Sequence, residues 1–168
     1  MKGSDFLRDF GSTIDTATTV QPDETYPVQH AADHHVLEAR RVRNFVDYLE
    51  EANRETDPRK RAGALNRAGH LMYASHLSYT NDAMLGADEC DLLVKLVRDR
   101  ERQGLYGAKI TGGGSGGTVA VLADVSASAD AAIADILATY ESQTGRKPEL
   151  FTGSSDGAWR VGSSLVRS

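Results

Sequence analysis

The sequence contains a single cysteine, and this scarcity limits the kind of protein it can be. Cys90 has no second cysteine among the 168 residues to pair with, which excludes an internal disulfide and predicts a reducing, cytoplasmic location. Without a basic neighbour it is predicted to be an inert, partly buried thiol. No apolar run approaches the roughly 20 residues that span a bilayer. The N-terminus lacks a secretory signal pattern, so no membrane partner is expected.

An excess of positive charge is also missing. Nineteen lysine and arginine residues face 24 aspartate and glutamate residues, which gives a net charge of −5. Binding to nucleic acid needs a basic face. The densest arginine group, Arg40, Arg41 and Arg43, is interspersed with acidic residues and predicts a solvated helix face. Nucleic acid is therefore not expected as a partner.

Two groups of polar residues resemble sites, but neither pattern is complete. His30, His34 and Glu38 are spaced by four, as metal ligands on one helix face would be. They have no second ligand cluster, so a solvated helix end is favoured over zinc and no metal site is predicted. Residues 75–78 contain serines and a histidine within one helical turn, without a nucleophile elbow or an orienting aspartate. Hydrolase chemistry is not expected there.

Hydrophobic periodicity predicts helices first and then strands. Asp57 is suited to cap a helix that begins at Pro58, and Gly145 is suited to end the last one. The predicted helices cover the regions 42–49, 57–79, 87–99 and 128–142; the predicted strands cover 13–20, 105–111, 117–123, 148–154 and 158–162, with a further extended piece at 24–30. This order predicts a single α+β domain over residues 1–168, with helices packed on one face of a mostly antiparallel sheet.

A run of six small residues, Gly112 to Gly117, separates two of the predicted strands. It lacks the Gly-Lys-Ser/Thr ending of a P-loop, and it joins strand to strand rather than strand to helix. One interpretation is a flexible hairpin. The other is a backbone concavity for an anion or for a second, phosphate-holding loop, because successive N–H groups lie there without side-chain cover. Two or three glycines suffice for a hairpin, which favours the second interpretation.

The sequence around this run resembles the third conserved motif of the GHMP kinases. The motif is carried by "YGAKITGGGSGGTVAVL", residues 106–122. Residues 71–99 resemble the pair of helices with a Ser-His-x-Ser stretch, residues 24–29 a tyrosine-containing strand, and residues 149–162 the closing strand of that superfamily. The resemblance covers nearly the whole chain and is strongest to the sugar kinases of arabinokinase and galactokinase type. It implies the ferredoxin-like C-terminal lobe of such a kinase.

The resemblance implies transfer of the γ-phosphoryl group of ATP to the anomeric hydroxyl of a sugar, with Mg²⁺, by positioning and charge neutralisation. The family's phosphate loop and the arginine and aspartate that act on the sugar belong to its N-terminal lobe, and the sequence shows neither. The expected partners are therefore that absent lobe and a sugar. The chain is predicted to hold no catalytic residue and to be inactive alone, with a homodimer as a further possibility.

The resemblance also implies roles for particular residues. Tyr26 corresponds to a sugar-binding tyrosine, whereas Lys109 is predicted to lie at the surface. The residues expected to pack against the nucleotide-phosphate loop are Thr111, Gly112, Gly113, Gly114, Ser115, Gly116 and Gly117. The competing hypothesis is a non-catalytic α+β module that binds a small metabolite or a second copy of itself, with the glycine run as an ordinary loop.

Overall fold

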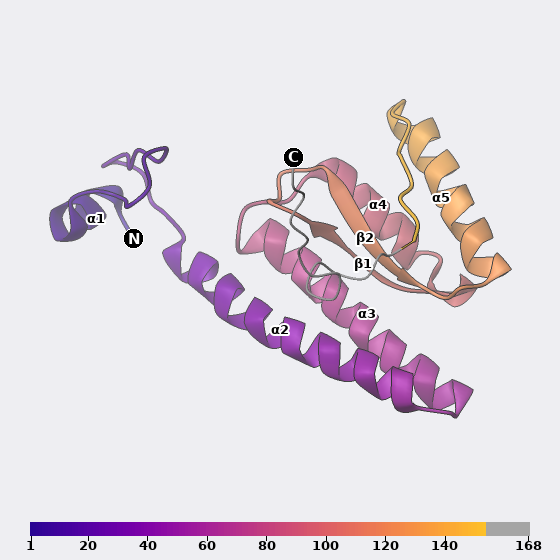
Figure 1. Ribbon diagram of the computed structural model, residues 1–168. Helices are drawn as coiled ribbons and strands as arrows, with labels where there is room; N and C mark the ends of the chain where they lie inside the picture. Colours follow the sequence, from indigo (N-terminus) through magenta and orange to yellow (C-terminus); the bar gives the residue numbers. More distant parts are fainter. Residues whose placement is uncertain (154–168) are drawn as a thin grey trace, which may run out of the picture.

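A computed structural model describes residues 1–153 of the chain. Along the sequence these residues form α1 (Gly3–Phe10), α2 (Val28–Arg54), α3 (Pro58–Asn81), α4 (Asp88–Arg98), a short 3₁₀ helix η1 (Glu101–Gln103), β1 (Leu105–Thr111), β2 (Thr118–Ala123) and α5 (Ala127–Thr144) (Figure 1). The helices within this range are all too short or too polar to cross a membrane.

The two strands form an antiparallel hairpin. Lys109 lies opposite Ala120, and Thr111 lies opposite Thr118 at the end where the strands join. A register shift between Leu105 and Gly107 marks a bulge at the other end. The α+β class predicted from the sequence is confirmed, and the strands of the described part are antiparallel as expected.

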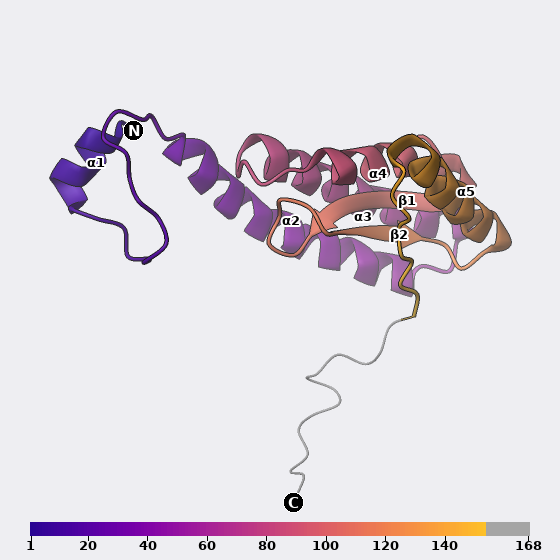
Figure 2. The same ribbon diagram turned by 90° about the horizontal axis from the view of Figure 1, so that it is seen from above.

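The helices pack against this hairpin in two groups. The long helices α2 and α3 run side by side, joined by a short turn, and α3 also lies along β1 (Figures 1 and 2). Helices α4 and α5 pack on each other and cover the apolar face of the hairpin, where Leu105 and Ala108 are fully buried. The main core consists of Tyr73, Val94, Leu96, Val97, Leu105, Ala108, Ala129, Ala132, Ile136 and Tyr140.

The predicted helix ends are confirmed by their hydrogen bonds. The Asp57 carboxylate accepts from the Arg59 N–H, with Pro58 at the first helical position. Gly145 ends α5 with a left-handed φ of 70°. Helix α5 is capped at its start by Ser126, whose side chain accepts from the Ala129 N–H. This serine was a signal in the sequence for the start of the helix, and the prediction did not include it.

The N-terminal thirty residues differ from the prediction. Residues 13–20 do not form a strand: the Asp15 carboxylate accepts from the N–H groups of Ala17 and Thr18, a local turn that competes with extended pairing. The short helix α1 was not predicted, and it lies apart from the hairpin, beyond the start of α2 (Figure 2). Of the extended piece at 24–30, only Thr25 pairs, with Lys2, before α2 begins at Val28.

The predicted strands at the C-terminal end also need correction. Residues 148–153 follow α5 as irregular chain rather than as a strand. Pro148 supplies no N–H to a ladder, and none of these residues pairs with β2 in the described part. The predicted strand at 158–162 lies outside the described residues.

Candidate functional site

The run of small residues forms the loop that closes the β1–β2 hairpin. Thr111 and Thr118 pair across the strands, so residues 112–117 make up the whole connection. A positive φ is adopted by Gly112, Gly114, Ser115, Gly116 and Gly117. Because residues with a Cβ rarely take that conformation, the loop requires glycines for its own backbone path. Gly113 is the one position in it without a positive φ.

One side of this glycine loop (residues 112–117) rests on the turn between α3 and α4. The Tyr79 hydroxyl donates to the Gly112 carbonyl at 3.2 Å, and the Ser115 N–H donates to the Leu85 carbonyl at 2.7 Å. Gly114 packs against the same turn so closely that a Cβ there would lie 2.6 Å from the Leu85 Cβ. The loop is therefore anchored at its first residue and in its middle.

The other side of the glycine loop is open. A Cβ added at Gly112, Gly113 or Gly117 would meet no other heavy atom within 4 Å, and Thr111 beside them is exposed. The hairpin interpretation from the sequence is thus confirmed, and a role beside an anion stays a prediction. The run is a hairpin loop, and part of its main chain is bare and accessible.

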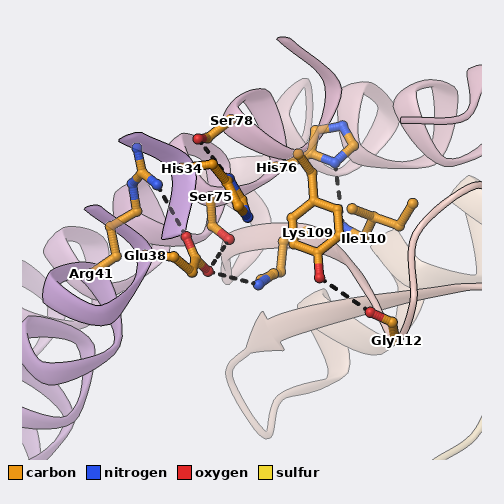
Figure 3. A network of polar contacts seen from close by, with 10 residues as sticks. His34, Glu38, Arg41, Ser75, His76, Ser78, Lys109, Ile110 and Gly112 are labelled. Atoms are coloured by element: carbon orange, nitrogen blue, oxygen red, sulfur yellow. Dashed lines mark hydrogen bonds and ion pairs between the residues drawn. The ribbon is translucent and has the colours of Figure 1, made fainter. Parts of the chain in front are cut away.

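A group of charged side chains lies beside the loop, between α2, α3 and β1 (Figure 3). Glu38 of α2 accepts a bond from the Lys109 ammonium at 3.1 Å through Oε1, and from the Arg41 guanidinium at 3.1 Å through Oε2. The Ser75 hydroxyl of α3 also donates to Glu38 Oε1. We call these four residues the Glu38 cluster. Its three charged side chains are only 18–24% exposed.

The Glu38 cluster corrects two expectations. Arg41 was predicted to belong to a solvated helix face, and Lys109 to the surface, yet both side chains are largely covered and bonded to Glu38. Burial by itself would raise the pKa of Glu38, but the bonds from Ser75, Lys109 and Arg41 outweigh it and hold the pKa below its ordinary value. The carboxylate is therefore held ionised as the shared acceptor of the cluster.

A groove of about 270 Å³ opens next to the Glu38 cluster. Its polar end is formed by the cluster, and the rest of its wall is apolar. The lining residues are Glu38, Arg41, Val42 and Phe45 of α2, Leu71, Met72 and Ser75 of α3, Lys109 of β1 and Ala120 of β2. The groove is small for a drug-sized ligand but has a charged end that could orient a small amphiphilic one.

Two histidines of α2, His30 and His34, contact the C-terminal end of α3. His34 Nδ1 lies 2.8 Å from the Ser78 hydroxyl, which donates to Asp82 at 2.7 Å, and His30 Nδ1 lies 3.4 Å from the same carboxylate. Because Glu38 is bonded to Lys109, the three residues spaced by four each make a different contact. No group of three or more metal-ligating side chains occurs among residues 1–153. The periodicity correctly indicated a shared face, but the partner helix could not be read from it.

His76 is buried and connects β1 to α4. Its Nδ1 accepts from the Ile110 N–H at 3.3 Å, so Nε2 carries the proton, and this nitrogen lies 3.2 Å from Asp91 Oδ1 of α4. Burial lowers the pKa of His76, and the neighbouring Asp91 only partly opposes this. The ring therefore has a structural role between α3, β1 and α4.

Tyr26 and Cys90 were also singled out from the sequence. The Tyr26 hydroxyl accepts from the Gln21 N–H at 2.9 Å, and its other polar contacts are with Met1 and Val28, so it is engaged with the N-terminal segment. Cys90 is buried, and burial raises the pKa of its thiol, as expected for an inert cysteine.

Comparison with known proteins decides the family. Residues 40–142 match the family described as "GHMP kinases C terminal". The chain belongs to the GHMP kinase C-terminal domain family. It is also 35% identical to L-arabinokinase of Arabidopsis thaliana over 99% of its own length, although the aligned part is only 16% of that protein. The resemblance seen in the motifs is thus confirmed.

The family match also sorts the residues of this GHMP kinase domain. The glycine loop, Ser75 and Lys109 lie inside the matched region, whereas Tyr26 and Glu38 precede it. Tyr79, which anchors the loop, also lies inside it. The sequence predicted a helix over residues 57–79 but gave no sign that the hydroxyl of Tyr79 contacts a loop 33 positions away.

Proposed function

We propose that the chain is the C-terminal lobe of an ATP-dependent sugar kinase of arabinokinase or galactokinase type, which phosphorylates the anomeric hydroxyl. The observation that carries this proposal is the division of the glycine loop into an anchored part and a bare part. Membership of the GHMP kinases and similarity to a protein named L-arabinokinase support the reaction class. The chain spans 16% of the length of that relative, and we assign the catalytic groups to a further lobe.

The bare backbone suits a place beside phosphate groups. Phosphoryl transfer depends on positioning and charge neutralisation rather than on covalent chemistry by the protein. Main-chain N–H groups that no side chain covers can approach an anion closely. We assign this approach to Thr111 and the glycine loop, which would lie against the nucleotide phosphates of ATP held by the other lobe. Mg²⁺ typically binds through one or two carboxylates together with the phosphates of the nucleotide, so we assign it to the lobe that holds them.

Exposed apolar side chains at two places support the docking of another lobe. Leu77, Met84 and Leu85 are exposed around the loop's anchoring turn, and Val42 and Val46 are exposed on α2. Exposed apolar side chains that gather on one part of a surface mark interaction sites. A kinase lobe separated from its partner is expected to present such a surface.

The proposed contact with the sugar is assigned to a single residue. Tyr26 is assigned to the sugar by its correspondence with the galactokinase tyrosine, and its hydroxyl is bonded to the Gln21 N–H. Contact with a sugar would require the hydroxyl to exchange that bond for one to the substrate. The chain alone is expected to show no sugar kinase activity.

The substitution Gly113→Ala tests the role of the glycine loop. Gly113 has an ordinary φ and open space around it, so a methyl group there leaves the fold and the loop path unchanged. In an assembly of this chain with the N-terminal kinase lobe of L-arabinokinase, we expect ATP-dependent formation of sugar 1-phosphate, detected by phosphorus NMR. Gly113→Ala should lower its rate by about tenfold or more, because the methyl group displaces the phosphates.

Gly63→Ala is the matched control for this experiment. It makes the same chemical change on α3, where the nearest atom to the new methyl group is the flexible end of Arg67 at 3.7 Å, and its rate should equal that of the wild type. Equal rates for Gly113→Ala and the wild type would contradict the role of the loop. An assembly without any ATP-dependent phosphorylation would contradict the proposed function itself.

The alternative, a module that binds a small metabolite or a second copy, is favoured by the groove beside the Glu38 cluster. Sedimentation of the chain with and without the N-terminal lobe separates the two. A stable dimer that ignores the added lobe would favour the alternative, whereas a one-to-one complex favours the kinase.

A further inference from the structure

We infer that Tyr79 is a positioning residue, and that the turn between α3 and α4 sets the path of the glycine loop within this lobe before any other lobe docks. The inference deepens the proposed function, because the loop it concerns is the one assigned to the phosphates. Its physical basis lies entirely in contacts of this chain.

The glycine loop needs an external anchor. Five of its six residues have a positive φ, and glycines lose more conformational freedom on folding than any other residue. A loop of this composition, held only at the Thr111–Thr118 pair, would populate many backbone paths. The contacts from Tyr79 and Leu85 hold the loop at its first residue, Gly112, and at its fourth, Ser115. These contacts select one path.

The anchor is itself fixed from several sides. The Tyr79 ring meets His34 of α2 edge to face, with 5.0 Å between ring centres, and the Lys109 ammonium lies 5.4 Å from its centre. Lys109 is held in turn by Glu38. The Glu38 cluster therefore keeps the aromatic ring in place, and the ring keeps the Gly112 carbonyl in place.

The turn that carries Leu85 is also held in an uncommon conformation. Met84, directly before Leu85, has a φ of 58°, which few residues with a Cβ adopt. The Leu85 N–H donates to the Tyr79 carbonyl at 2.9 Å, so both anchors of the loop are bonded to each other. Tyr79 thus contributes through its hydroxyl and through its main chain, and only the hydroxyl is removed by Tyr79→Phe.

The first arm of the test uses the 168-residue chain alone. Amide hydrogen exchange and ¹⁵N relaxation, followed by NMR, are compared between wild type, Tyr79→Phe and Tyr106→Phe. Tyr106 is the matched control, because its hydroxyl donates to Asp124 at 2.9 Å at the opposite end of the same hairpin. We expect Tyr79→Phe to increase the mobility and the exchange of residues 112–117, and Tyr106→Phe to leave them unchanged. An unchanged loop in Tyr79→Phe would overturn the inference.

The second arm uses the assembly with the N-terminal lobe. Tyr79→Phe should lower kcat/KM for ATP by about threefold to tenfold, the effect of one lost hydrogen bond, while KM for the sugar stays as in the wild type. A purely structural role would change both substrates alike or neither. Equal kinetics for Tyr79→Phe and Tyr106→Phe would also overturn the inference. If the wild-type assembly shows no activity, the proposed function fails, and the first arm still decides whether Tyr79 positions the loop.

Discussion

The two ends of the contact between α3 and β1 are built in different ways. At one end, which we call the closed end, Gly69 of α3 lies directly against the main chain of Tyr106 and Gly107. At the open end, beside the glycine loop, Tyr79 reaches the Gly112 carbonyl across the gap with its whole side chain. Helix and strand run in the same direction and diverge along their length.

Between these ends, side chains fill the widening space between α3 and β1. His76 spans it to the Ile110 N–H, one turn of helix before Tyr79, and the Glu38 cluster lies beside it. The closed end has no room for a side chain, so only van der Waals contact between backbones is possible there. The open end has room for polar groups, and those groups hold the loop. The divergence thus separates a region that stabilises the domain from one that can serve its function.

The largest effect is expected from breaking the closed end with Gly69→Ala. A Cβ at Gly69 would overlap the carbonyl group of Tyr106, and neither backbone can move without disrupting β1 or α3. We expect a loss of about 3 kcal/mol or more in the free energy of unfolding, measured by urea denaturation. Gly63→Ala on the same helix should be neutral or slightly stabilising. A loss below about 1 kcal/mol for Gly69→Ala would show that the backbones are not in contact.

A smaller effect is expected from Glu38→Gln in the open region. The substitution leaves Lys109 and Arg41 without their shared counter-charge, which should cost about 1–3 kcal/mol of unfolding free energy at pH 7. Because the pKa of Glu38 is lowered in the folded state, its contribution is complete above the ordinary pKa of about 4.3 and is lost as the pH falls through the lowered value. The difference between wild type and Glu38→Gln should therefore shrink in urea titrations near pH 3.

Glu50→Gln is the control for that titration. Glu50 pairs with Arg54 on the exposed part of α2, with a side chain 61% exposed, and such pairs contribute little. If Glu50→Gln and Glu38→Gln lose the same stability at pH 7, the Glu38 cluster is no more than a surface ion pair.

Local features could be predicted from the sequence, whereas contacts between residues far apart in the sequence could not. The hairpin around residues 112–117 and the cap at Asp57 follow from residue types in a short stretch, and both were confirmed. Glu38 and Lys109 are 71 positions apart, and no local pattern connects them. The sequence predicted a solvated helix end for Glu38 and, from the alternation along its strand, a surface position for Lys109; charged residues are most often exposed.

The apolar face of α2 also shows that a sequence pattern does not identify the partner of a surface. Val42, Phe45, Val46 and Leu49 share helical spacing, and such a face predicts burial. In the structure Val42 and Val46 are exposed, because α3 covers only part of that face. Periodicity reports that a surface is apolar; it does not report whether this chain or another one covers it. The proposed docking of a second lobe would account for the remainder.

The smallest effect is expected from His76→Gln, midway between the two ends. The Gln carboxamide oxygen can still accept from the Ile110 N–H, so the cost at pH 7 should be about 1 kcal/mol or less. Burial lowers the pKa of His76 in the folded state, so the unfolded chain takes up the proton first. Wild-type stability should therefore fall as the pH drops below the ordinary histidine pKa of about 6.5, and this slope should be reduced in His76→Gln between pH 6.5 and 5.

His76→Ala separates the hydrogen bond from the titration in this window. It removes the acceptor of the buried Ile110 N–H and should cost more than His76→Gln at pH 7, while it flattens the same slope. Equal slopes in wild type and both variants would mean that His76 titrates freely. In that case water would reach the middle of the α3–β1 contact. The space between α3 and β1 would then open directly after Gly69 rather than widen gradually toward Tyr79.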